Sequence, residues 1–125
     1  MRVPILGSVS AGRPMDCIPI VSWRTIRPIK GRALRDQFAC VRVVGDSLSG
    51  ANICNGDFAI LRLTNEARPG DLVVASTPMG LTIKYLDYAD GRILLRCANP
   101  ACSDQQWDPE DVRIQGVVKR VERDL

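Results

Sequence analysis

Short runs of apolar residues, rich in valine, leucine and isoleucine, recur along the second half of the chain, and each run ends in a turn signal. The segments predicted as strands are residues 40–45, 58–63, 71–76, 81–88, 92–97 and 113–122. Sequences typical of turns separate them: CNGD at 54–57, ARPGD at 67–71, TPMG at 77–80, ADG at 89–91 and ANPACSD at 98–104. Many short strands with closely spaced turns predict an all-β protein, a sandwich or a barrel-like sheet, rather than βαβ units.

The first 37 residues have a different pattern. They hold four of the eight prolines, and only residues 3–9 have the pattern of a strand. Residues 30–37 indicate at most one helical turn. A helix-turn-helix needs helices of a kind that this pattern does not contain, so we expect no direct sequence-specific DNA binding by this chain.

A length of 125 residues predicts about one domain. The net charge of +3, from 17 basic and 14 acidic residues, is too small to imply a nucleic-acid partner. One N-terminal stretch is nevertheless basic and contains only two acids, Asp16 and Asp36; its basic residues are Arg13, Arg24, Arg27, Lys30, Arg32 and Arg35. Such a stretch is either solvated surface or a contact surface for an acidic partner.

Location and redox state follow from what the sequence lacks. No apolar run approaches the roughly 20 residues of a membrane helix, and no secretory leader is recognisable, so we expect no membrane association and a cytoplasmic protein. The five cysteines are Cys17, Cys40, Cys54, Cys97 and Cys102. Their odd number argues against a disulfide framework, and we expect buried, unreactive thiols.

The chain contains no histidine and no CxxC pair. Without histidine, Ser–His–Asp and Cys–His catalysis are impossible, and a zinc site would need unfavourably spaced thiolates or carboxylates. We therefore expect no metal and no cofactor. A catalytic base would have to be a lysine, a carboxylate or a tyrosine.

The segment GDSLSGANI, residues 45–53, contains the first candidate for chemistry, Ser47. Glycine and aspartate end a strand here, and the serine follows at the predicted start of a short helix. Free backbone N–H groups at such a start favour negative charge, which suits a nucleophile whose attack creates an oxyanion. Alternatively, Ser47 is only the N-cap of the helix.

The second candidate is Lys84, in the predicted strand LTIKYLDY. The strand period of two places Leu81, Ile83 and Tyr85 on one face, with Thr82, Lys84 and Leu86 on the other. A lysine at this position either reaches solvent from an edge or is partly buried. In the buried case desolvation lowers its pKa, and the neutral amine can take a proton from a serine hydroxyl.

These segments together resemble the LexA/UmuD-like self-cleaving proteins, the S24 peptidases. The motifs that carry the resemblance are, in order, VSAGRP, VVGDSLSGANICNGDFAIL, RPGDLVVA, LTIKYL, LLRCANP and IQGVVKRV. The separations agree too, with 36 positions from Ala11 to Ser47 (47 − 11) and 37 from Ser47 to Lys84 (84 − 47). One departure is GDSL in place of the usual GDSM, a near-isosteric change that should cost little.

The resemblance implies a compact, bent antiparallel β fold with one short helical turn after the nucleophile. It implies Ser47 and Lys84 as a catalytic dyad, oxyanion binding by the backbone N–H groups of Asp46 and Ser47, and cleavage of the Ala11–Gly12 bond. Cleavage would separate residues 1–11 from 12–125. The implied division is an N-terminal arm with the cleavage segment, residues 1–14, and a peptidase domain, residues 15–125.

The family resemblance also implies a homodimer, stimulation by the RecA filament on single-stranded DNA, and a role in an SOS-type response to DNA damage. The chain resembles either a UmuD-like accessory protein of a Y-family DNA polymerase or the C-terminal domain of a LexA-like repressor. Two alternatives remain: a non-catalytic dimerisation or binding module, and a signal-peptidase-like enzyme, which the missing membrane anchor disfavours.

Overall fold

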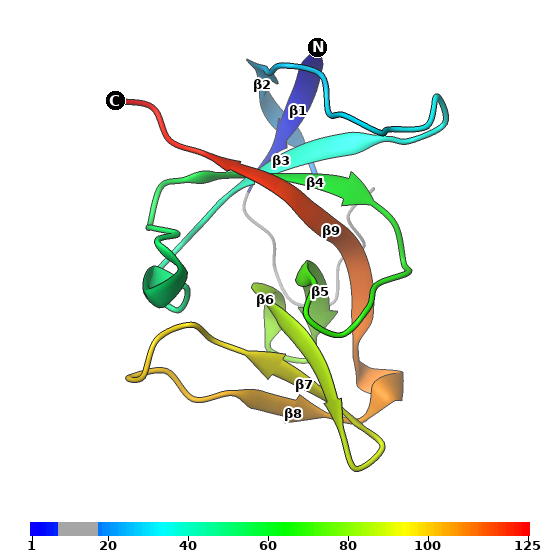
Figure 1. The fold of residues 1–125 in the computed structure, drawn as a ribbon, viewed down its shortest axis with the longest axis vertical. Coiled ribbons are helices and arrows are strands. Elements are labelled where there is room, and N and C mark those ends of the chain that lie inside the picture. The colour runs from blue at the N-terminus through cyan, green and yellow to red at the C-terminus, as the bar shows by residue number, and fades with distance from the viewer. Residues whose placement is uncertain (8–17) are drawn as a thin grey trace.

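A computed structural model describes residues 1–7 and 18–125 and confirms the all-β class (Figure 1). The described strands are β1 (Arg2–Leu6), β2 (Ile20–Thr25), β3 (Phe38–Arg42), β4 (Phe58–Leu63), β5 (Leu72–Thr77), β6 (Gly80–Ala89), β7 (Arg92–Arg96), β8 (Gln105–Trp107) and β9 (Arg113–Glu122). Two 3-10 helices of three residues each, η2 (Ser49–Ala51) and η3 (Pro109–Asp111), interrupt this pattern. The helical turn expected after Ser47 is therefore present, as η2.

All of these strands join one sheet in the order β2-β1-β3-β4-β9-β5-β6-β7-β8. The pairings are antiparallel except that of β1 with β3. The long strand β9 lies at the centre and connects the β1–β4 part to the β5–β8 part, as Figure 1 shows. Its register shifts once against β4 and once against β5. Such irregularities bend a strand, so one sheet can enclose a core on itself.

Strand prediction succeeded where apolar residues recur densely. β4 and β9 have the predicted bounds, and β5 and β6 differ by one residue at each end. β2 and β8 were missed, because most of β2 is solvent-exposed and β8 has three residues without an apolar run. The segment 30–37 forms turns but no helix.

The alternation of β6 is confirmed. Leu81, Ile83 and Tyr85 pack against one apolar cluster, whereas Leu86 belongs to another. Gly116 in β9 faces Leu61 and the carbonyl of Arg62 so closely that any Cβ would collide with both. Close strand packing at the centre of the sheet therefore requires glycine at this position.

The expectation of buried thiols was wrong for three of the four cysteines that the structure describes. Cys97 and Cys102 form a disulfide, with their Cα atoms 6.2 Å apart, and Cys54 is exposed. The chain folds back after β7, which brings two residues only five positions apart into bonding distance. Cys40 is buried as expected, and burial raises the pKa of its thiol to about 11.

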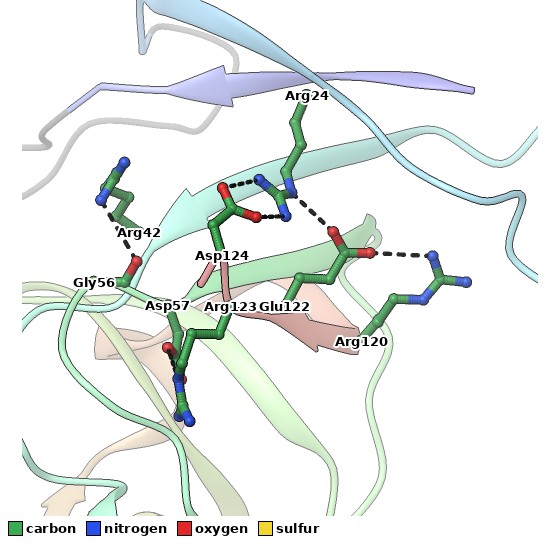
Figure 2. A network of polar contacts seen from close by, with 8 residues as sticks. All are labelled: Arg24, Arg42, Gly56, Asp57, Arg120, Glu122, Arg123 and Asp124. Carbon is green, nitrogen blue, oxygen red and sulfur yellow. Dashed lines mark hydrogen bonds and ion pairs between the residues drawn. The ribbon is translucent and has the colours of Figure 1, made fainter.

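Ion pairs connect the C-terminal end of the chain to two other regions (Figure 2). Arg24 of β2 donates to Glu122 at 2.8 Å and to both carboxylate oxygens of Asp124. Arg123 donates to both oxygens of Asp57, at 2.8 and 2.9 Å. Asp57 is 2% exposed and also accepts from the N–H of Cys54. The C-terminal end thus holds the turn that follows η2.

This arrangement predicts an acid-sensitive contribution of Asp57 to stability. The hydrogen bonds from Arg123, and then that from Cys54, lower the pKa of Asp57 to about 2, whereas an unfolded aspartate has a pKa of about 4. A lowered pKa stabilises the fold above pH 4, and that contribution disappears as the pH falls through 2. Asp57→Asn should therefore be less stable than the wild type at pH 7, and the difference should shrink between pH 4 and pH 2. Urea unfolding at several pH values measures this, and a pH-independent difference would contradict it.

Candidate active site

A cleft of about 510 Å³ lies between β1, β3, β6 and the loop that follows β3. Both candidate residues, Ser47 and Lys84, line it. Its walls are otherwise mainly apolar, with Ile5, Val21, Val41, Val43, Leu81 and Ile83 among the lining residues. Two residues that are 37 positions apart in sequence (84 − 47) thus line the same cleft.

Ser47 lies in a loop whose backbone is held from several sides. The carbonyl of Asp46 accepts from the N–H of Ser49 at 3.1 Å, and Leu48 is 1% exposed in the core below the loop. Gly45, with φ of +87°, donates its N–H to the side chain of Asn55 at 2.8 Å. Positive φ at this point favours glycine, which explains the glycine before the aspartate.

The interpretation of Ser47 as an N-cap was wrong. The residue at the N-cap position of η2 is Leu48, and no side chain caps the helix. Within the described part of the chain, neither the N–H of Asp46 nor that of Ser47 donates a hydrogen bond. Ser47 lines the cleft, and Asp46 directly precedes it in the same loop.

Lys84 occupies the middle of β6, opposite Val73 of β5. Its side chain is buried, at 9% exposure, and its Nζ donates to Oγ1 of Thr82 at 2.7 Å. Of the two alternatives that the sequence left open, the buried one is therefore correct. Burial lowers the pKa of Lys84 below its ordinary value. No carboxylate among the described residues forms an ion pair with Lys84, so no described negative charge offsets this desolvation.

The expected target, Ala11–Gly12, lies outside the described residues. The two ends of the segment that contains it are described, however. Leu6 and Gly7 line the cleft, and the N–H of Gly7 donates to Pro19 at 2.9 Å. Ala11 follows Gly7 by four residues, so an extended chain would carry it up to about 14 Å from Gly7. Gly7, a wall residue of the cleft, is thus the last described residue before the segment that contains the predicted target.

Sequence reasoning missed several residues that support the site. Asn99 donates from Nδ2 to the carbonyl of Asp46 at 2.9 Å, and the N–H of Ala98 donates to the carbonyl of Ser47 at 2.8 Å. The Asn-Pro sequence at 99–100 was recognised as a turn and as part of a motif that carries the family resemblance, but its contacts with the Ser47 loop were not foreseen. Thr82 was placed on the same face as Lys84, but its hydrogen bond to the amine was not foreseen.

Within residues 1–7 and 18–125, no cluster of three or more cysteine, aspartate or glutamate side chains has a geometry that would hold a metal ion. The same residues contain no helix long and apolar enough to cross a membrane.

Three known proteins to which this chain is similar are named as LexA repressors. LexA repressors of Erythrobacter litoralis and Syntrophotalea carbinolica are each 35% identical to it, over 93% and 98% of the chain respectively. A LexA repressor of Novosphingobium aromaticivorans is 33% identical over 93% of the chain. The aligned part covers 49%, 60% and 49% of these three relatives, so the chain spans about half the length of the repressors it matches.

The sequence pattern of the family described as Peptidase S24-like matches residues 4–119, which include both candidate residues and most of the sheet. Together with the cleft and these relatives, the match identifies the chain as a member of the peptidase S24-like family.

Proposed function

We propose that this chain is a self-cleaving serine peptidase in which Lys84 activates Ser47 to cut the Ala11–Gly12 bond. The observation that carries the proposal is a lysine that is buried in the same cleft as the serine and has no acidic partner among the described residues. A buried lysine that serves only structure would be expected to form an ion pair, because an isolated buried charge is costly. A base, in contrast, must be able to lose its proton near neutral pH.

The proposed reaction begins with proton transfer from Ser47 Oγ to the neutral amine of Lys84. The Oγ then attacks the carbonyl carbon of Ala11, and the N–H groups of Asp46 and Ser47 bind the oxyanion that forms. The ammonium of Lys84 returns the proton to the nitrogen of Gly12 as the peptide bond breaks. Water, deprotonated by Lys84, hydrolyses the acyl-enzyme and regenerates Ser47.

In this scheme the cleavage segment reaches the site because its two ends are held beside the cleft. Leu6 and Gly7 form part of the cleft wall, and Ile18 is 5% exposed in the apolar cluster that contains Leu48. The apolar walls suit Val9, and small residues at Ala11 and Gly12 allow close approach to Ser47. We retain the division into an arm, residues 1–14, and a peptidase domain, residues 15–125. Because β1 pairs with β2 and β3, cleavage by itself breaks the covalent connection and not these pairings.

The wider role follows the relatives, which are named as LexA repressors. We propose that the chain acts as the homodimeric, cytoplasmic peptidase part of an SOS-type regulator whose cleavage is stimulated by the RecA filament on single-stranded DNA. A UmuD-like partnership with a Y-family polymerase is the second candidate, and the family resemblance is its support. If the site proves inactive, the remaining candidate is that the chain is a non-catalytic dimerisation or binding module.

The proposed base predicts cleavage that accelerates with pH. Because desolvation lowers the pKa of Lys84, the neutral amine becomes populated as the pH rises through that lowered value, and the first-order rate should rise and then level off. Purified protein incubated between pH 7 and pH 10 should yield a new N-terminus at Gly12, measured by mass spectrometry of the fragments. A rate that does not change over this range would contradict lysine as the base.

Substitution of either site residue should abolish the reaction. Ser47→Ala and Lys84→Ala should remain uncut at pH 10, with losses of at least about a thousandfold in rate, as in other peptidases that lose a nucleophile or base. Ser22→Ala and Lys119→Ala, which change an exposed serine and an exposed lysine, are the matched controls and should be cut normally. Cleavage of either site variant at Ala11–Gly12 would show that the assignment is wrong.

A buried base that has no acidic partner in the described part of the chain should also reduce the stability of the fold. Below the lowered pKa, Lys84 is charged in both the folded and unfolded states, and only the folded state bears the desolvation. Lys84→Met should therefore raise the free energy of unfolding at pH 7 by about 1 kcal/mol. The gain should fall as the pH rises toward about 10.4, where the unfolded lysine also becomes neutral. Chemical denaturation measures the free energy of unfolding at pH 7 and at higher pH, and Lys119→Met is the control. A Lys84→Met protein that is less stable than the wild type at pH 7 would contradict this prediction.

A further inference from the structure

The loop after β7 is closed by the Cys97–Cys102 disulfide and holds the Ser47 loop at three points. The N–H of Ala98 donates to the carbonyl of Ser47 at 2.8 Å, and the carbonyl of Ala98 accepts from the N–H of Gly50 at 2.5 Å. The third contact is the Asn99 side chain, whose Nδ2 donates to the carbonyl of Asp46 at 2.9 Å. All three contacts come from the two residues that directly follow Cys97 inside the disulfide ring.

The fit between the two loops is close. A Cβ on Gly50 would collide with the carbonyl oxygen of Ala98, so the loops meet backbone to backbone. Bonds inside the ring orient the Asn99 side chain and backbone: its Oδ1 accepts from the N–H of Ala101 at 2.9 Å, and its carbonyl accepts from the N–H of Cys102 at 3.0 Å. The disulfide therefore closes a ring whose internal bonds set the direction of the Asn99 amide.

Peptide geometry connects these contacts to the proposed oxyanion site. The C=O of Asp46 and the N–H of Ser47 belong to one planar trans peptide unit, so they point in opposite directions. When Asn99 fixes the direction of the Asp46 carbonyl, it also fixes the direction in which the Ser47 N–H points. Preorganised donors of this kind stabilise an oxyanion without reorganisation during the reaction.

We propose that Asn99 is a positioning residue for the oxyanion site and that the Cys97–Cys102 disulfide keeps it in place, so that reduction of the disulfide slows self-cleavage. This inference rests on the proposed function. Reduction transfers two electrons and two protons from a dithiol. One thiolate of the dithiol attacks a sulfur of the disulfide, which breaks the S–S bond, releases one cysteine thiol and leaves a mixed disulfide; the second thiolate of the dithiol then attacks the mixed disulfide and releases the other cysteine thiol. The products are two cysteine thiols and an oxidised dithiol. Both cysteines are partly exposed, which gives a reductant access.

The first test compares the cleavage rates of oxidised protein and protein reduced with dithiothreitol. Reduction should slow cleavage about three- to tenfold, the effect expected from weakening one or two hydrogen bonds. The pH midpoint of the rate should not move, because Lys84 is untouched. Cys97→Ser/Cys102→Ser should cleave at the reduced rate with or without reductant, whereas the control Cys54→Ser should keep the full response. Equal rates for oxidised and reduced wild type would overturn the proposal.

The second test separates the amide of Asn99 from loop structure in general. Asn99→Asp keeps an acceptor for the N–H of Ala101 but has no N–H to donate to Asp46. It should cleave as slowly as the reduced wild type and should respond little to reductant, because both changes remove the same contact. If reduction slows Asn99→Asp by the same factor as it slows the wild type, Asn99 does not transmit the effect of the disulfide, and the proposal is wrong.

The third test does not require cleavage. Hydrogen exchange on Ser47→Ala reports the inter-loop bonds directly, because the amides of Gly50 and Ala98 are their donors. Reduction should speed exchange of these two amides about three- to tenfold and leave those of β4 and β9 unchanged. Unchanged exchange at Gly50 and Ala98 would overturn the proposal. If wild-type protein never cleaves at any pH, the proposed function fails, and the exchange data alone decide whether the disulfide orders the Ser47 loop.

Discussion

The burial of the Lys84 amine, with no carboxylate partner in residues 1–7 and 18–125, is the constraint on which the rest of the site depends. Its side chain lies in a sheet among apolar residues, and its described hydrogen bond is to a neutral hydroxyl, that of Thr82. An environment of this kind disfavours the ammonium form, which is unfavourable for stability and useful for a base. A catalytic lysine therefore lowers the stability of the fold while it serves as a base, whereas a lysine that serves only structure would not carry this cost.

The bent sheet makes this burial possible. β9 joins the two parts of the sheet at its centre, and β6 enters the cleft with Lys84 at mid-strand, opposite Val73. The Ser47 loop, which follows β3, lines the same cleft, and backbone hydrogen bonds with Ala98 hold it in place. The C-terminal end contributes too, because Arg123 bonds both the buried carboxylate of Asp57 and the carbonyl of Asn52, just after η2. Elements from the whole chain thus maintain one small cleft.

Local pattern was sufficient for part of this structure. Dense apolar periodicity predicted β4 and β9 to the residue, and the strand period placed Lys84 on the face opposite Leu81 and Ile83. β2 was not predicted because it is an edge strand that exposes Ile20, Val21 and Trp23, so it lacks the contrast between inner and outer faces that reveals a strand.

The remaining features depend on contacts between distant segments. Whether Lys84 is solvated or buried is decided by the strands and loops that surround it, and these come from both ends of the sequence. The Cys97–Cys102 disulfide and the bond from Asn99 to Asp46 depend on the path of a loop that no periodicity describes. Ser47 was recognisable from the sequence motif around it, but the contacts that hold its loop are visible only in the structure.

The most direct test of the account is the pKa of Lys84 itself, measured by heteronuclear NMR titration of its side chain in the uncleavable Ser47→Ala protein. We predict a pKa clearly below the ordinary lysine value of about 10.4 and close to the pH midpoint of the wild-type cleavage rate. An ordinary pKa, or one that does not match the midpoint, would contradict Lys84 as the base.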